Sequence, residues 1–190
     1  MIWAVVLAAG ESRRMGTQKL LLPFGETTVL GAVLRTASAS LVDRCLVVVG
    51  ADRRAVRREA APRGVEIAVN EDYRQGMLSS IQAGFQALPE EARAAVIMLG
   101  DQPFLAPGTV DAVIDAYEAA GCGLVVPAFR GRRGHPVLVG LEYRNELLAL
   151  DPAEGLRALM RAHSRQVRQA AVTDPNILRD LDTPEDYRKA

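Results

Sequence analysis

Cysteine and histidine are scarce in this sequence. Its 190 residues include two cysteines, Cys45 and Cys122, and two histidines, His135 and His163. None of the four lies at metal-ligand spacing from another, so the pattern predicts neither a zinc centre nor a disulfide framework. We therefore expect a cytoplasmic protein that works in a reducing compartment.

An excess of charge of one sign is also absent. The chain has 23 Lys and Arg residues against 23 Asp and Glu residues, which gives a formal net charge of zero. This balance argues against a broad surface for nucleic acid or a membrane, but it permits a local basic pocket. No apolar run reaches transmembrane length, and the apolar start of the chain lacks the positive flank of a signal peptide. We expect small molecules as partners, with no nucleic acid and no membrane.

Apolar runs of strand length alternate with segments of helical periodicity. The pattern predicts strands over residues 2–9, 45–49, 65–69, 94–99, 123–127, 137–139 and 166–172. It predicts helices that start near residues 28, 52 and 183, and others over residues 77–88, 107–119, 142–150 and 154–163. This alternation favours an α/β fold with a mostly parallel central sheet, helices on both faces, and one domain over residues 1–190.

The first predicted strand ends in a cationic loop with two glycines. Gly10 and Gly16 flank Ser12 and Arg14, and Lys19 follows. Glycines let a backbone approach phosphate oxygens, and cations neutralise their charge. Glycine spacing excludes both a Walker loop and a dinucleotide fingerprint. A merely solvated surface loop is the alternative, but its place directly after a buried strand favours phosphate binding.

Two aspartates are candidate metal ligands. Asp101 directly follows the fully apolar run of residues 94–99, where a carboxylate can hold magnesium or simply cap a turn. Asp182 can cap the last helix beside Thr183 or reach back as a second ligand, and spacing along the chain leaves both open. In parallel sheets the ligand crevice lies beyond the carboxyl ends of the strands. We therefore expect the loops over residues 10–19, 70–76 and 100–103 to open on one edge.

Three further polar residues have two readings each. Ser79 and Ser80 are either ordinary first-turn helix residues or ligands that present hydroxyl groups at a helix start. His135 lies in a Gly-His-Pro turn beside several arginines, which slightly favours substrate contact over a structural role. His163 has no polar cluster around it in the sequence, so we expect it to be structural.

Five motifs occur in order along nearly the whole chain. They are Leu7-Ala-Ala-Gly-x-Ser-x-Arg-Met-Gly-x-x-Lys19, Gly76-Met-x-Ser-Ser80, Gly100-Asp-Gln-Pro103, Gly134-His-Pro136 and Asp180-x-Asp-Thr-Pro-Glu-Asp186. Together they resemble the MobA-like nucleotidyltransferases, specifically the molybdenum cofactor cytidylyltransferase branch. The first motif is typical of the wider superfamily, and the Ser-Ser, Asp-Gln-Pro and Gly-His-Pro elements narrow the resemblance to this branch.

The resemblance implies a fold, a reaction and a set of roles. The fold is the Rossmann-like, GT-A-like fold of nucleotide-diphospho-sugar transferases. The reaction is the magnesium-dependent transfer of CMP from CTP to the phosphate of molybdopterin, with release of pyrophosphate. Manganese is open as a substitute, because both ions prefer oxygen ligands. The implied catalytic residues are Lys19, Arg14 and Asp101, and the implied metal ligands are Asp101 and Asp182.

The same resemblance implies the substrate contacts. The nucleotide-binding positions correspond to Leu7, Ala8, Ala9, Gly10, Ser12, Arg14, Gly16, Lys19, Ser79 and Ser80. Guanylyl-transferring relatives usually have Gly-Gly where this chain has Ala8-Ala9, which favours a pyrimidine. The acceptor would contact Gly134, His135 and Pro136. A transient contact with a molybdenum hydroxylase or its chaperone is also implied.

Alternative functions stay open at this point. One is a nucleotidyltransferase for a sugar or alcohol phosphate, or a relative that uses GTP. Another is a non-catalytic carrier that delivers the molybdenum cofactor to an enzyme, although Lys19, Asp101 and Asp182 argue against lost catalysis. Redox use of the same scaffold lacks a nicotinamide fingerprint in the sequence.

Overall fold

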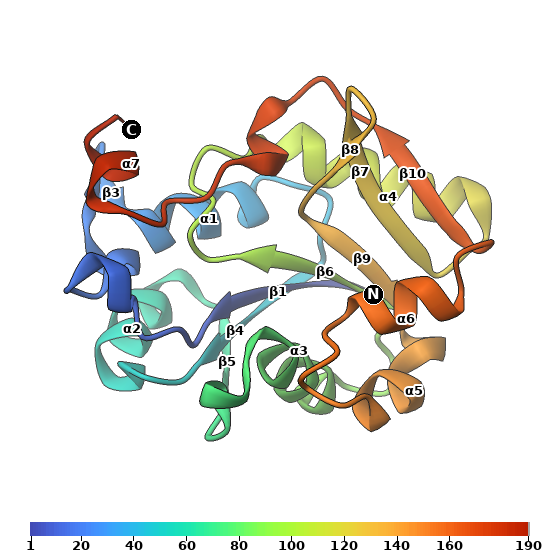
Figure 1. Cartoon of the computed structure of the whole chain (residues 1–190), viewed down its shortest axis with the longest axis horizontal. Coiled ribbons are helices and arrows are strands. Elements are labelled where there is room, and N and C mark those ends of the chain that lie inside the picture. Colours follow the sequence, from blue (N-terminus) through green and yellow to red (C-terminus); the bar gives the residue numbers. More distant parts are fainter. Residues whose placement is uncertain (190) are drawn as a thin grey trace.

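A computed structural model of the chain describes residues 1–189. Its main sheet contains β1 (Ile2–Ala8), β4 (Arg44–Val49), β5 (Glu66–Val69), β6 (Ala94–Leu99), β7 (Leu124–Phe129), β8 (Arg132–Arg133), β9 (Val137–Gly140) and β10 (Val167–Ala171). The strand order is β10-β7-β9-β6-β1-β4-β5, with β8 paired to β7 (Figure 1). Two short strands, β2 (Pro23–Phe24) and β3 (Thr27–Thr28), form a separate antiparallel pair.

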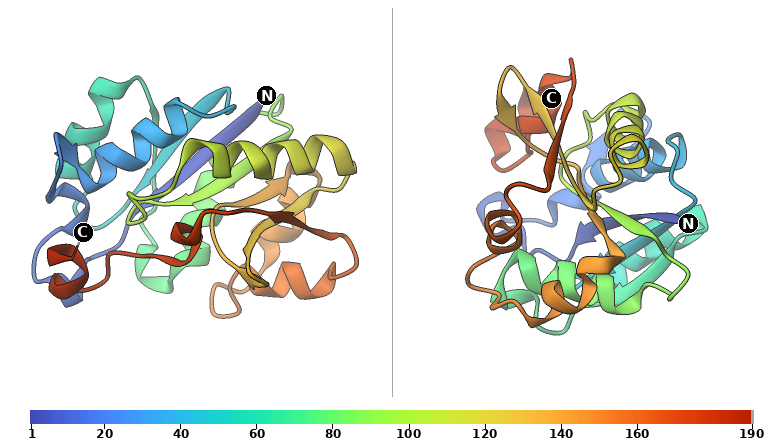
Figure 2. Two further views of the ribbon diagram at one scale, coloured as in Figure 1. Left: turned by 90° about the horizontal axis from the view of Figure 1, so that it is seen from above. Right: turned by 90° about the vertical axis from the view of Figure 1, so that its right-hand side faces the viewer.

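Helices cover both faces of the main sheet, as the sequence predicts (Figure 2). The helices are α1 (Val29–Ser38), α2 (Arg53–Ala60), α3 (Met77–Ala87), α4 (Pro107–Ala120), α5 (Arg144–Ala149), α6 (Arg157–Ala162) and α7 (Pro184–Arg188). Helices α1, α2 and α4 pack into one hydrophobic core, and α3, α5 and α6 pack into the other. Over residues 1–189, no helix has both the length and the apolarity needed to cross a membrane.

The two central strands, β1 and β6, are parallel neighbours and are buried on both faces. In β1, Ala4 and Val6 belong to the first core, whereas Trp3 and Val5 belong to the second. Because neither face meets water, these strands are nearly continuous apolar runs, which is why the sequence identifies them clearly. Gly84 lets α3 approach β1 closely, since a Cβ atom there would lie 2.6 Å from Cγ1 of Val5.

The strand order places a topological switch at β1. Strands β4 and β5 extend the sheet on one side of β1, and the chain then crosses over to add β6 on the other side. Loops that follow adjacent strands diverge at such a reversal, and this opens a crevice at the carboxyl ends of the strands. The loops after β1 and β6 both end at this crevice.

Three details differ from the expectations. The apolar run at residues 137–139 forms β9, which runs antiparallel between β6 and β7 and makes the sheet mixed. Helix α6 begins at Arg157, later than expected, because the chain turns at Gly155 with φ of 69°. The two-residue strands β2, β3 and β8 have no periodicity long enough to be predicted.

Candidate active site

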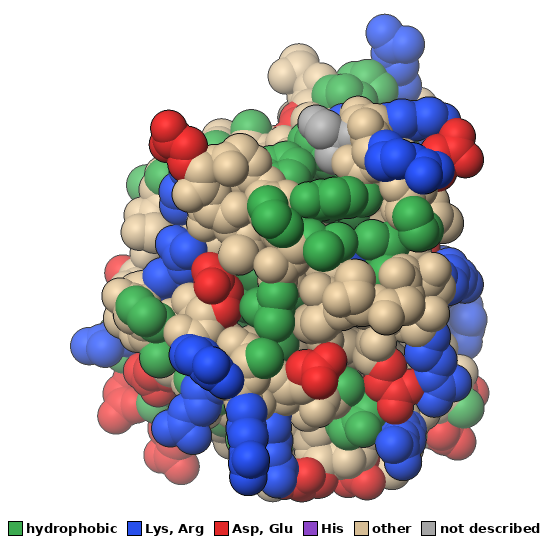
Figure 3. Space-filling view, turned by 90° about the vertical axis from the view of Figure 1, so that its left-hand side faces the viewer, with side chains coloured by type: hydrophobic (Ala, Val, Ile, Leu, Met, Phe, Trp, Pro, Cys, Tyr) green, Lys and Arg blue, Asp and Glu red, His purple; other side chains and the backbone are tan. Residues whose placement is uncertain are grey.

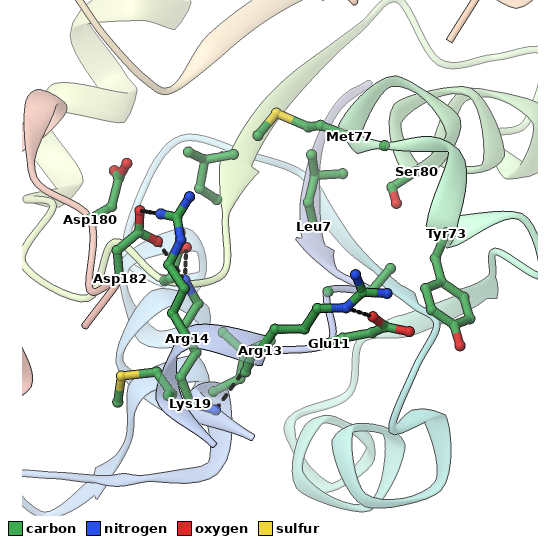
Figure 4. A pocket seen from close by; sticks show the side chains of 18 of the residues that line it. Leu7, Glu11, Arg13, Arg14, Lys19, Tyr73, Met77, Ser80, Asp180 and Asp182 are labelled. Atoms are coloured by element: carbon green, nitrogen blue, oxygen red, sulfur yellow. Dashed lines mark hydrogen bonds and ion pairs between the residues drawn. The ribbon is translucent and has the colours of Figure 1, made fainter. Parts of the chain in front are cut away.

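A cavity of about 530 Å³ opens at the carboxyl ends of β1 and β6. Its walls come from four separate parts of the chain, namely residues 7–20, 73–80, 99–101 and 180–182 (Figure 4). The expectation that the loops after the first, third and fourth predicted strands share one edge is therefore correct. Figure 3 shows the molecule from this side, and basic and acidic side chains are interspersed there rather than gathered into one large patch of either sign.

The loop after β1 folds onto itself through local hydrogen bonds. Ser12 and Gly16 both have left-handed backbone conformations, with φ of 52° and 67°. The Ser12 hydroxyl donates to Oε1 of Gln18 at 2.8 Å and accepts from the backbone N–H of Lys19 at 3.1 Å. Gln18 in turn donates to the carbonyl oxygen of Gly10 at 3.2 Å. These contacts fix the point from which the Lys19 side chain enters the cavity.

Lys19 joins the two candidate metal ligands. Its Nζ lies 2.5 Å from Oδ2 of Asp101 and 3.0 Å from Oδ1 of Asp182, which are 82 and 163 residues away in the sequence. Arg14 contacts the second oxygen of Asp182, with 3.2 Å between Nη1 and Oδ2. The structure thus brings Arg14, Lys19, Asp101 and Asp182 together in one cluster at the cavity wall.

Burial and charge act in opposite directions on this cluster. Burial is the largest single effect on Lys19 and lowers its pKa, but the two carboxylates together outweigh it and hold the pKa above the ordinary value. Burial also raises the pKa of Asp101, and Lys19 opposes that effect. Because Lys19 bonds directly to two carboxylates, we regard its ammonium as charged, which gives the cavity a fixed cation.

The C-terminal segment holds Asp182 in place. Thr183 caps α7 through a capping box, in which its hydroxyl accepts from the backbone N–H of Asp186 and the Asp186 carboxylate accepts from Thr183. The backbone N–H of Leu181 donates to the carbonyl oxygen of Asp101 at 3.0 Å. Thr183, and not Asp182, is therefore the N-cap residue of α7, and the Asp182 carboxylate bonds to Lys19 instead. The interpretation of Asp182 as a helix cap is wrong.

The opposite end of the cavity contains residues that the sequence did not single out. Glu11 accepts hydrogen bonds from Arg13 and Arg74, and these bonds lower its pKa. Tyr73 completes this end (Figure 4). Glu11, Arg13, Tyr73 and Arg74 lie in two loops that were expected at this edge, but no local motif distinguishes the side chains that face the cavity from those that do not.

Some expected contact residues line the cavity and others lie behind it. Leu7, Ala9, Gly10 and Ser80 line it, together with Ser12. The structure does not bring Ala8, Gly16 or Ser79 to the cavity wall. Ser79 is buried, and its hydroxyl accepts a hydrogen bond from the side-chain amide of Asn70 at 2.9 Å.

The Gly-His-Pro turn also lies outside the cavity wall. The backbone N–H of His135 donates to the carbonyl oxygen of Ile177 at 3.1 Å, so the turn supports the C-terminal segment from behind. Nδ1 of His135 is buried and has no hydrogen-bond partner. Burial lowers the pKa of His135, and the charge of Asp180, a backbone hydrogen bond with Ile97 and the charge of Asp101 oppose this effect.

The carboxylates of Asp101 and Asp182 suit an oxygen-preferring divalent cation. Both lie within 3.0 Å of one ammonium group, so Asp101 and Asp182 are the residues that would hold such a cation. Within residues 1–189, no group of three or more His, Cys, Asp or Glu side chains is arranged to hold a metal. Mg²⁺ is usually bound by one or two carboxylates, and phosphate oxygens and water fill its other coordination positions. The residues present therefore fit a cation that is bound together with a phosphorylated substrate.

Residues 4–167 match the family model described as the MobA-like NTP transferase domain. The chain belongs to this family of nucleotidyltransferases.

Relatives of similar length are named for different functions. The chain is 29% identical to the molybdenum cofactor cytidylyltransferase of Escherichia coli K12, over 96% of this chain and 92% of the relative. It is 31% identical to the purine catabolism protein PucB of Bacillus subtilis 168, over the same shares of the two chains. It is also 29% identical to the nicotine blue oxidoreductase of Paenarthrobacter nicotinovorans, over 97% and 93%. Family membership therefore leaves the acceptor open.

Solved structures share the fold over nearly the full length. The protein Rv0371c of Mycobacterium tuberculosis H37Rv superimposes with a TM-score of 0.88 at 37% identity, over 99% of this chain and 95% of the other. A structure of that protein in complex with manganese has a TM-score of 0.83 at 34% identity, over 99% and 96%. The predicted α/β nucleotidyltransferase fold is confirmed.

Proposed function

We propose that this protein transfers CMP from CTP to the phosphate of the molybdopterin cofactor and releases pyrophosphate. The observation that carries the proposal is the contact of the Lys19 ammonium with both Asp101 and Asp182 inside the cavity of a MobA-like domain. The similarity to the E. coli molybdenum cofactor cytidylyltransferase supports the choice of substrates.

The cavity offers a different environment to each part of a nucleotide. Ser12, Arg14 and Lys19 present hydrogen-bond donors and cations that suit the triphosphate. Leu7, Ala9, Gly10 and Ser80 form a less charged wall that suits the base. Ala8 and Gly16 would act through the backbone shape of the loop, and Ser79 through its contact with Asn70.

The reaction needs positioning and charge neutralisation more than proton transfer. An oxygen of the acceptor phosphate attacks the α-phosphorus of CTP in line, a new P–O bond forms, and the bond to the β-phosphate oxygen breaks so that pyrophosphate leaves. Lys19 and Arg14 stabilise the negative charge that grows on the leaving group. Magnesium or manganese, held by Asp101 and Asp182, would supply further neutralisation of the phosphate oxygens.

Direct contact of Gly134, His135 and Pro136 with the acceptor stays a prediction. The hydrogen bond from His135 to Ile177 supports an indirect contribution, because the segment that it braces continues to Asp182. In this proposal the turn positions the carboxylates of the C-terminal segment, and no catalytic histidine is needed.

The test is pyrophosphate release with each of the four NTPs, with Mg²⁺ or Mn²⁺, and with or without molybdopterin. We expect release only with CTP, a divalent cation and molybdopterin together. Release with GTP, or with a sugar phosphate in place of molybdopterin, would assign a different member of the same reaction class. Tight binding of molybdopterin without release under any condition would favour the carrier.

A further inference from the structure

Asp180 differs from the other carboxylates of the cavity because no cation contacts it. Within residues 1–189, Asp101 and Asp182 pair with Lys19, and Glu11 pairs with two arginines, but Asp180 is in no salt bridge. Among the residues that the structure describes, one hydrogen bond reaches its side chain, from Nε2 of Gln102 to Oδ1 at 2.6 Å. In Figure 4, Asp180 and Asp182 come from the same C-terminal segment, and no dashed line joins Asp180 to another of the side chains drawn.

A buried polar cluster behind the cavity wall supports Asp180. Gln102 is 3% exposed, and its Oε1 has no hydrogen-bond partner in the described part of the chain. Nδ1 of His135, which is close enough for its imidazole to sense the charge of Asp180, is likewise buried without a partner. Buried polar atoms are nearly always bonded, so the two unpartnered atoms indicate space for an ordered water behind the wall, and the bond from Gln102 fixes the Asp180 carboxylate from that side.

The chemistry around Asp180 suits a flat ring with N–H groups on its edge. A carboxylate without a cation repels phosphates, so the part of a substrate that lies there must donate hydrogen bonds instead. Leu99 and Met77 line the same cavity without belonging to the wall assigned to the base, and they offer apolar surface to the faces of a ring. Met77 is 54% exposed, and its flexible thioether makes favourable contacts with aromatic rings.

We propose that Asp180 recognises the N–H edge of the pterin ring of the acceptor. A 2-amino-4-oxopteridine carries a ring N–H and an amino group side by side, and a carboxylate accepts from both in parallel. Gln102 is the positioning residue that orients the carboxylate. This inference rests on the proposed function and adds the residue that distinguishes a pterin from a sugar or alcohol phosphate.

The test compares two fluorescent probes that differ in one substituent. Pterin has the 2-amino donor, and lumazine has a carbonyl acceptor in its place. We expect the full-length protein, titrated into each probe, to bind pterin about tenfold or more tightly than lumazine. Asp180→Asn should abolish this preference, and Gln102→Met, which keeps the volume but removes the hydrogen bond, should reduce it. Glu185→Gln removes one charge from the same segment far from the cavity, and it should leave the preference unchanged.

Equal binding of the two probes, an unchanged preference in Asp180→Asn, or no measurable binding of pterin would overturn the inference. So would a loss of CTP affinity in Asp180→Asn with pterin binding intact, because Asp180 would then face the nucleotide. The two proposals fail separately. Pterin selectivity without pyrophosphate release refutes cytidylyl transfer, whereas transfer to molybdopterin without pterin selectivity refutes only the role of Asp180.

Discussion

The loop after β1 and the C-terminal segment over residues 174–189 line the same cavity, but different contacts hold them in place. The loop is shaped mainly by hydrogen bonds within ten residues, such as those of Ser12 with Gln18 and Lys19, and Gln18 adds one distant bond to Asp52 at 3.0 Å. The C-terminal segment is held by distant partners. The Arg179 guanidinium lies 3.6 Å from the ring centroid of Phe104, and the Tyr187 hydroxyl donates to the carbonyl oxygen of Pro23 at 2.5 Å.

The two regions meet at Asp182, where two cations compete in unequal surroundings. The side chain of Lys19 is 15% exposed, whereas that of Arg14 is 75% exposed. Water screens the charge of an exposed cation strongly and that of a buried cation weakly, so equal charges have unequal effects. Lys19 should therefore dominate the chemistry, and Arg14 should modulate it.

The largest expected effect comes from removing either member of the buried pair. Lys19→Ala and Asp101→Ala should each reduce pyrophosphate release by about 100-fold or more, because each removes a charge that the reaction needs in a low-dielectric site. Steady-state rates with CTP, magnesium and molybdopterin measure this, and circular dichroism melting checks that each variant is folded. Near-normal turnover of either folded variant would contradict the assigned roles.

Asp182→Asn tests whether the C-terminal segment supplies a metal ligand or only forms part of the cavity wall. We expect transfer activity to need a higher Mn²⁺ concentration, because one oxygen ligand loses its charge. Titration of activity and of Mn²⁺ binding by electron paramagnetic resonance measures this shift. Asp174→Asn is the matched control, since Asp174 accepts hydrogen bonds from Ala106 and Thr109 and should affect the melting temperature but not the metal requirement.

Arg14→Gln should have a smaller effect that depends on salt. We expect a loss of about tenfold at low ionic strength that shrinks as salt is added, because an exposed charge is screened over about 10 Å at 0.1 M salt. Rates measured over a salt series separate this behaviour from that of Lys19→Ala. A loss as large as that of Lys19→Ala at every salt concentration would show that exposure does not rank the two cations.

The smallest expected effect concerns pH and His135. Burial holds the pKa of His135 below its ordinary value, so the folded protein binds fewer protons than the unfolded chain below about pH 6.5. Stability from this group is therefore complete above that pH and declines as the pH falls toward the lowered pKa. Urea unfolding at neutral and mildly acidic pH should show this decline, and His135→Gln should reduce it.

His163 provides the comparison for that measurement. It lies at the surface and contacts Glu146, with 2.8 Å between Nε2 and Oε2. His163→Gln should leave the acid-dependent loss of stability in place. If His163→Gln removed it and His135→Gln did not, the buried histidine would not be the source.

Much of the fold was predictable because the central strands lie between two cores. The alternating burial of Trp3 to Val6 makes β1 apolar throughout, and the same holds for β6. The direction of β9 was not predictable, because four apolar residues fit a parallel or an antiparallel neighbour equally well. The late start of α6 depended on the left-handed conformation of Gly155, which the helical spacing of apolar residues does not reveal.

The candidate site divides in the same way. Lys19 and Asp101 each follow a buried strand, so local pattern alone indicates that they lie at the ligand edge. Glu11 and Tyr73 also line the cavity, but nothing in their neighbours in the sequence separates them from ordinary surface residues, and Asp180 opens a recognisable motif that assigns it no role. For Ser79 the error runs the other way. It lies in a recognisable motif that predicts a ligand contact, but its hydroxyl bonds to Asn70.

By itself, the sequence determined what local forces decide, namely the apolar central strands, the cationic glycine loop and the capping box at Thr183. Only the tertiary structure decided that Asp182 meets Lys19 across 163 residues and that Asp180 meets Gln102 across 78. Backbone conformation depends on near neighbours, whereas the meeting of distant side chains depends on how the whole sheet is ordered and covered. Lys19 therefore had a predictable place, and its partner Asp182 acquired a role only when the C-terminal segment packed against the loop after β6.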